Sequence, residues 1–387
     1  EYSRDDEAVV AVRAGCRGPV ADDGLARAVA LAARCDAALV VVGLPDRYES
    51  EGYDRPDMAL TGDQSILIER VAAANPRTIV VILSGSPVDM RPWIHRVGAV
   101  VQAWYAGQEC GYALADILFG DVNPSGKLPT TFPWRLEDTP AYINYPGENG
   151  AVLYGEGIFV GYRYYDEKGI EPLFPFGHGL SYTTFTYANP RCRAEPMGLD
   201  DTLQVSVDVT NAGPRAGQEV VQLYLRDPEC SLSRPPRELK GFRKVSLAPG
   251  ETQTVTFALT IRDLAFYDPA RSGWVAEAGE FVALLGSSSR DIRAHVAFAL
   301  QVPGGGAVRV EPGPRTILPR LTADSPLAAI LADRRGKALL QKHLGPLMQS
   351  PRLRWMSGYT LRQLAGISAG VSPQAVEAIG RELAQLT

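Results

Sequence analysis

Apolar positions along the chain follow two different periods. From residue 36 to residue 120, short apolar runs alternate with segments of helical period. The runs predict buried strands within residues 36–44, 78–85 and 98–105, and the other segments predict helices within residues 63–75, 87–97 and 109–120. Because strands and helices alternate, the expected fold class is α/β, a three-layer α/β sandwich with a mainly parallel sheet. In the first helix, one face is expected to carry Ile66, Leu67, Val71 and Ala74.

Between residues 200 and 300 the period changes to two. The run LQVSVDVT places Leu203, Val205, Val207 and Val209 on one face, and VVQLYL and TVTFAL repeat the alternation. The turn sequences NAGPRAG and LAPGE separate these runs. This pattern predicts an antiparallel β-sandwich of about a hundred residues.

The C-terminal part of the chain returns to a helical period after a linker rich in glycine and proline. In SPQAVEAIGRELAQL, Ser372 and Pro373 occupy the expected N-cap and first helical positions. Val376, Ile379 and Leu383 form an apolar stripe behind them. The sequence therefore predicts a small helical tail.

Composition and charge exclude several classes of partner. The 387 residues carry a net charge of −5, which leaves no basic surface for nucleic acid. No run approaches the roughly 18 apolar residues of a membrane helix, and no signal peptide is visible. The 5 cysteines and 4 histidines are scattered without the spacing of a metal site or a disulfide framework. We therefore expect no metal, no cofactor, no nucleic acid, no membrane partner and a cytoplasmic location.

Acidic residues gather directly after the first predicted strand, with Arg47 and Arg55 between them. Ligands of parallel sheets bind at the carboxyl ends of the strands, and a carboxyl group can deliver the proton that glycosidic hydrolysis requires. The spacing alone, however, favours a solvated loop held by salt bridges to the two arginines. The cluster consists of Asp46, Glu49, Glu51, Asp54 and Asp57.

Other motifs give little support to a different chemistry. The segments GQECG and GEGIFVG match neither a dinucleotide fingerprint nor a phosphate loop, so a nucleotide-binding α/β protein is disfavoured. Ser84 lacks the elbow motif of a serine hydrolase. His178 is interpreted as a packing residue. The tyrosines and Phe159 of YGEGIFVGYRYYD could stack on sugar rings or pack between domains.

Several segments together resemble a known family. They are SEGYDRPDMALTGDQ, AANPRTIVVILSGSPVDM, VVQAWYAGQECGYALADILFGDVNPSGKLPTTFP, YGEGIFVGYRYYD and PLFPFGHGLSYTTF. In this order they resemble the C-terminal portion of glycoside hydrolase family 3, of the β-glucosidase type. The resemblance covers residues 20–300 and its motifs are specific to that family.

The resemblance implies a domain organisation. Residues 1–19 resemble the exit from an insert domain, and residues 20–182 an α/β-sandwich domain. Residues 183–302 are similar to a fibronectin type III-like domain, and residues 303–387 to a linker with a helical extension.

The resemblance also assigns roles within the acidic cluster. Glu51 corresponds to the family's general acid/base, with Glu49, Asp54 and Arg55 supporting its loop. The family takes its nucleophile from an N-terminal (β/α)8 barrel, and these 387 residues contain no segment like it. The expected activity is retaining, β-glucosidase-like hydrolysis that releases a terminal non-reducing sugar. The expected partners are a β-linked glycoside and either a separate barrel-containing chain or a homo-oligomer. The alternative is a non-catalytic structural or sugar-binding remnant of such an enzyme.

Overall fold

The structure is a computed structural model, and the chain divides into two compact units, Glu1–Val310 and Glu311–Thr387. The segment predicted as the exit of an insert, residues 1–19, lies outside the described residues. No described helix is both long enough and apolar enough to cross a membrane. The described residues are 22–52, 54–193, 195–311, 323, 325, 327–349, 360–366 and 371–383.

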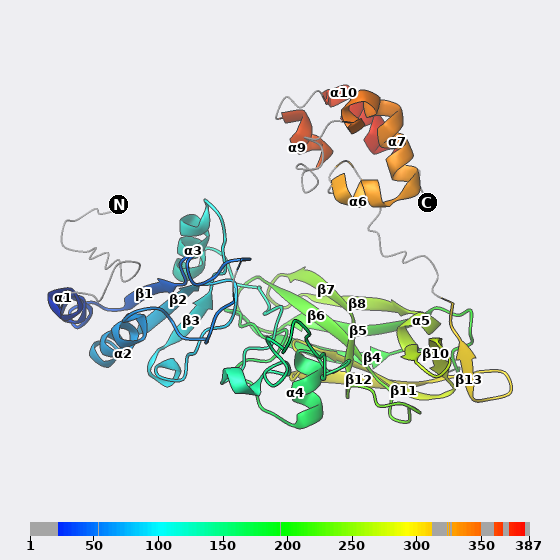
Figure 1. Cartoon of the computed structure of the whole chain (residues 1–387), viewed down its shortest axis with the longest axis horizontal. Coiled ribbons are helices and arrows are strands. Elements are labelled where there is room, and N and C mark those ends of the chain that lie inside the picture. Colours follow the sequence, from blue (N-terminus) through cyan, green and yellow to red (C-terminus); the bar gives the residue numbers. More distant parts are fainter. Residues whose placement is uncertain are drawn as a thin grey trace. The chain divides into compact units, whose positions relative to one another are not determined.

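The first unit contains a parallel sheet of order β1-β2-β3, formed by Ala38–Gly43, Thr78–Leu83 and Ala99–Gln102. Helix α1 (Asp22–Ala32) packs with α2 (Gln64–Ala74), and α3 (Cys110–Phe119) follows β3 (Figure 1). One face of the sheet is buried in a core with α2, through residues Val40, Val42, Val80, Ile82, Leu67, Ile68 and Val71. The predicted α/β domain with a parallel sheet is confirmed.

Two local predictions in this domain are wrong. Ile66 is 46% exposed, whereas Ile68 is fully buried, because the buried stripe of α2 consists of Gln64, Leu67, Ile68, Val71 and Ala72. The helix predicted within residues 87–97 is reduced to the 3-10 turn η1 (Ile94–Arg96). Pro87 and Pro92 lack the N–H groups that a longer helix would need there.

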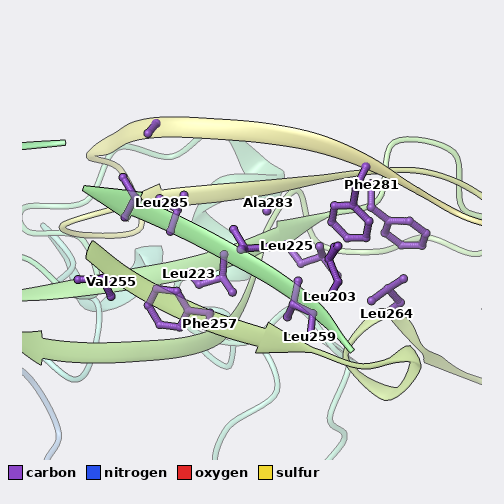
Figure 2. Close-up of a cluster of buried hydrophobic side chains, with 14 of the residues drawn as sticks. Leu203, Leu223, Leu225, Val255, Phe257, Leu259, Leu264, Phe281, Ala283 and Leu285 are labelled. Carbon is purple, nitrogen blue, oxygen red and sulfur yellow. The ribbon is translucent and has the colours of Figure 1, made fainter. Parts of the chain in front are cut away.

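The β-sandwich consists of antiparallel sheets. One has the order β4-β5-β8, formed by Phe185–Arg191, Leu203–Asn211 and Thr252–Leu259. The other has the order β12-β11-β6-β7, formed by Ile292–Leu300, Gly279–Gly286, Gly217–Arg226 and Glu238–Leu247. A third small sheet, β13-β10-β9, lies at one end and is formed by Ala307–Arg309, Gly273–Glu277 and Phe266–Asp268. Figure 2 shows apolar side chains gathered between the two larger sheets, including Leu223, Phe257 and Leu285.

The predicted alternation holds in β5, where Leu203, Val205, Val207 and Val209 are all fully buried. Strand β6 departs from it, because Gln222 and Tyr224 on its other face are buried as well. The ring of Tyr162 packs edge-on against Tyr224, and Gln222 donates to the carbonyl of Gly177 at 3.3 Å. Residues of the α/β domain therefore cover the outer face of this strand.

Shorter elements complete the two units. In the first they are η2 (Leu136–Asp138), α4 (Tyr162–Lys168) and α5 (Ile261–Leu264). The second unit is helical, and the N-cap predicted at Ser372 is confirmed, since its Oγ accepts from the N–H of Ala375 at 3.1 Å. The predicted stripe of Val376, Ile379 and Leu383 is buried. The described helices of the second unit are α6 (Leu327–Ala332), α7 (Arg334–Leu344), η3 (Gly345–Gln349), α9 (Leu361–Gly366) and α10 (Pro373–Leu383).

Candidate active site

The acidic loop leaves the parallel sheet at a point fixed by Gln64. This side chain is 2% exposed, and its Oε1 accepts from the N–H of Gly43, the last residue of β1, at 2.7 Å. Its Nε2 donates to the carbonyl of Gly43 at 2.9 Å. Gly43 itself allows a close approach of two strands, because a Cβ there would lie 2.3 Å from the carbonyl oxygen of Leu83. The start of the loop is therefore held on both sides.

Glu49 anchors this loop to the carboxyl ends of the other two strands. Its Oε2 accepts from the N–H of Gly85, just after β2, at 2.7 Å. The hydroxyl of Ser86, also after β2, donates to Oε1, and the phenol of Tyr105, just after β3, donates to Oε2. The segments that follow the carboxyl ends of all three parallel strands thus meet at the Glu49 carboxylate.

Arg55 completes the anchor from the far end of the loop. Its Nη1 lies 3.8 Å from Glu49 Oε1, donates to Ser86 Oγ at 2.7 Å and reaches the carbonyl of Pro87 at 3.4 Å. The Arg55 and Glu49 side chains are only 15% and 17% exposed. The loop is therefore closed on itself by a largely buried ion pair, and Arg55 also binds the segment that follows β2.

The ionisation of this network follows from burial and hydrogen bonds. Burial works to raise the pKa of Glu49, but the hydrogen bonds from Ser86, Tyr105 and Gly85 and the charge of Arg55 together hold that pKa below its ordinary value. Burial, aided by the hydrogen bond to Glu49, raises the pKa of Tyr105 to about 12. Tyr105 is thus a protonated donor and Glu49 a charged acceptor throughout the neutral range.

Glu51 differs from Glu49 in every respect that decides its chemistry. It is exposed, and the described residues provide no hydrogen bond or ion pair to its carboxyl group. The neighbouring turn is fixed locally, since Gly52 N donates to Ser50 Oγ at 3.3 Å. A carboxyl group in this position can exchange a proton with a molecule that approaches the carboxyl edge of the sheet.

The remaining acidic residues of the cluster have separate partners. Asp54 accepts a hydrogen bond from Tyr145, and this bond raises the pKa of the Tyr145 phenol. Asp57 Oδ1 accepts from the N–H of Ala59 at 2.9 Å. Asp46 and Arg47 also have contacts within the described chain. The predicted supporting residues Glu49, Asp54 and Arg55 thus tie the loop to three different segments.

Two residues considered from their motifs have structural surroundings. Ser84 is fully buried, and its Oγ donates to the carbonyl of Ser86 at 2.8 Å. His178 stacks on Phe174 with ring centroids 5.2 Å apart, and burial together with the nearby Lys127 charge lowers its pKa. Among the described residues, no group of three or more histidine, cysteine, aspartate or glutamate side chains could hold a metal ion.

Sequence reasoning missed four residues of the anchor, Gln64, Gly85, Ser86 and Tyr105. None of the four belongs to a residue type that by itself indicates a catalytic site. The last three lie 36 to 56 residues from Glu49 along the chain. The available signal was position, because Gly85, Ser86 and Tyr105 all follow predicted parallel strands, whose carboxyl ends share one edge.

Comparison with family models matches two ranges of the chain. Residues 4–162 match the glycosyl hydrolase family 3 C-terminal domain, and residues 219–289 match the fibronectin type III-like domain. The resemblance drawn from the motifs is confirmed over these ranges.

Similar curated proteins and solved structures are β-glucosidases. The chain is 54% identical over 261 residues to thermostable β-glucosidase B of Acetivibrio thermocellus, a match that covers 67% of this chain and 34% of the relative. It is 48% identical to a β-glucosidase of Rhizobium radiobacter, over 76% of this chain and 36% of the relative. The crystal structure of a Kluyveromyces marxianus β-glucosidase matches with a TM-score of 0.71 and 42% identity, over 76% of this chain and 34% of that one. The chain thus spans about a third of the length of the curated relatives it matches.

Proposed function

We propose that this chain, which corresponds to the C-terminal portion of a family 3 glycoside hydrolase, supplies the general acid/base half of a β-glucosidase-type active site. Glu51 protonates the leaving oxygen and later activates water, while a carboxylate nucleophile comes from a barrel that this sequence does not contain. The substrate is a β-linked glycoside, from which a terminal non-reducing sugar is released with retained configuration.

The observation that carries this proposal is the contrast between Glu49 and Glu51. Glu49 uses both carboxylate oxygens to fix the loop, through Gly85, Ser86 and Tyr105. Glu51, two residues further, is left exposed on the same loop. A general acid/base residue needs a loop that is held in place in this way, because effective proton transfer depends on a fixed position near the reacting atom.

A chimera tests the proposal directly. The matched segment of Acetivibrio thermocellus β-glucosidase B is replaced by this chain, and hydrolysis of p-nitrophenyl β-D-glucoside is measured. Glu51→Gln is expected to lower kcat/KM by roughly 100- to 10,000-fold, the usual contribution of a general acid/base. The loss should be smaller for 2,4-dinitrophenyl β-D-glucoside, whose leaving group needs no proton, and azide should restore turnover to Glu51→Ala.

The control is Glu167→Gln, an exposed glutamate on α4, which should leave the rate unchanged. A folded chimera that hydrolyses nothing would favour the alternative, a non-catalytic remnant. An active chimera in which Glu51→Gln is harmless would place the acid/base elsewhere.

A further inference from the structure

A pocket of about 570 Å³ lies in the β-sandwich, away from the acidic loop. It is lined by the end of β6, by the segment that joins β6 to β7, and by Leu284 and Ile292 of β11 and β12. Leu284 alternates with the core residues Ala283 and Leu285, so its side chain faces away from the sandwich core. The volume is within the range of small-molecule sites.

The segment over this pocket is held rigidly by Arg234. That side chain is 4% exposed and lies 2.9 Å from Asp227 and 2.7 Å from Glu238. It also donates to the carbonyl of Leu264 at 2.8 Å and lies over the ring of Phe266. Since the charge of Asp227 is matched by Arg234, neither group is left to bind a further ion.

Two other arginines that line the pocket have guanidinium N–H groups that could donate hydrogen bonds to a ligand. Arg226 is exposed at the end of β6, and within the described residues no hydrogen bond or ion pair engages its guanidinium group. Arg237 uses Nε on Asp166 at 3.0 Å and Nη1 on the carbonyl of Ser289. The Nη2 group of Arg237 has no assigned partner among the same residues.

The rest of the lining is apolar. Leu284 and Ile292 contribute aliphatic side chains, and three proline rings contribute C–H faces, at Pro228, Pro235 and Pro236. Of the three arginines that line the pocket, Arg234 is paired with Asp227 and Arg237 with Asp166, so the positive charge that remains for a ligand is mainly that of Arg226. The pocket therefore combines positive charge with an apolar wall.

We propose that this pocket binds a small organic carboxylate with an apolar ring. A guanidinium group matches the planar, two-oxygen geometry of a carboxylate, so Arg226 would take the anion with help from Arg237. The ring would pack on Leu284, Ile292 and the prolines. The site shares no residue with the acidic loop, and binding there does not depend on the proposed glycosidase activity.

Binding of benzoate to the intact chain tests this inference, followed by heteronuclear NMR and isothermal titration calorimetry. Benzyl alcohol is the neutral probe of similar shape, and inorganic phosphate is the anion without a ring. Benzoate is expected to shift the resonances of Ile292 and Arg226 in a saturable manner, with weaker binding at high salt. The variant Arg226→Gln should bind at least about tenfold more weakly, because a charge-assisted hydrogen bond is lost.

The matched control is Arg243→Gln, an exposed arginine of β7 outside the pocket, which should bind benzoate like the original chain. Equal binding of benzoate and benzyl alcohol would overturn the proposal, as would unchanged affinity in Arg226→Gln. Saturable phosphate binding without benzoate binding, or no binding of any probe, would also overturn it.

Discussion

At the scale of the residue, Glu49 combines a charge with partial burial, and the consequence is a dependence of stability on pH. Its pKa is held below the ordinary value of 4.5, despite burial, by Ser86, Tyr105, Gly85 and Arg55. A carboxyl group whose pKa falls on folding stabilises the folded state above its unfolded pKa, and this contribution is lost as the pH falls through its folded pKa. The anchor of the acidic loop should therefore be intact at neutral pH and weaken in acid.

The variant Glu49→Gln tests this. At pH 7 it should lower the free energy of unfolding of the first unit by about 1.5–3 kcal/mol, the range for hydrogen bonds to a charged group. The difference from the original chain should shrink as the pH falls below about 4.5. Urea unfolding across this pH range measures it. Glu69→Gln serves as control, because its pair with Arg96 is long, 3.9 Å, and open to solvent on the arginine side, so its effect should stay below about 1 kcal/mol at every pH. A Glu49 effect that is constant with pH would contradict the electrostatic explanation.

At the scale of the element, the end of β1 decides where the acidic loop begins. Gln64 belongs to α2, yet its side chain forms hydrogen bonds with both the N–H and the carbonyl of Gly43. In Gln64→Leu these two groups lose their partners in a partly buried place, which should cost about 2–3 kcal/mol. Hydrogen exchange should accelerate at Gly43 and also at Gly85, whose N–H depends on the position of Glu49.

The control for that variant is Gln108→Leu, which lies exposed in the same domain. It should leave the exchange rates at Gly43 and Gly85 unchanged. Faster exchange at Gly43 alone would show that the strand end and the Glu49 anchor are independent of each other.

The elements themselves were largely predictable, because the sequence period reflects burial on one face. This holds for β5, whose four predicted apolar residues are all fully buried, and for the capped helix α10. It fails in β6, where contacts from the α/β domain bury Gln222 and Tyr224, a tertiary effect that no local pattern contains. The candidate site is similar. The loop with Glu51 was visible as a cluster of acids, whereas its anchors Ser86 and Tyr105 could be found only by knowing which strand ends meet.

At the scale of the first unit, a group of buried ion pairs joins its two domains. Asp166 of α4 is 1% exposed and pairs with Arg290 at 2.6 Å and Arg237 at 3.0 Å, both from the β-sandwich. A second pair, Lys127 with Glu219, crosses the same boundary at 3.0 Å and is 14% and 5% exposed. Because several of these charges are largely out of water, removing one partner leaves the other uncompensated.

This argues for coupled unfolding of the α/β domain and the β-sandwich, which Asp166→Asn should disrupt. Burial raises the pKa of Asp166 while both arginines oppose it, so the charged form depends on their presence. The variant removes the carboxylate that pairs with Arg237 and leaves Arg290 with only the exposed carboxylate of Glu171, at 3.2 Å, as an ion-pair partner among the described residues. We expect a loss of about 2–3 kcal/mol, since both arginines keep some access to solvent. Calorimetry should then resolve two transitions, where we expect one for this unit in the original chain.

The control is Asp89→Asn, which removes a pair that is local to the α/β domain, with Arg91 at 2.6 Å, and should keep the single transition. A single, merely lowered transition in Asp166→Asn would mean that apolar packing, such as Tyr162 against Tyr224, couples the two domains without help from the ion pairs.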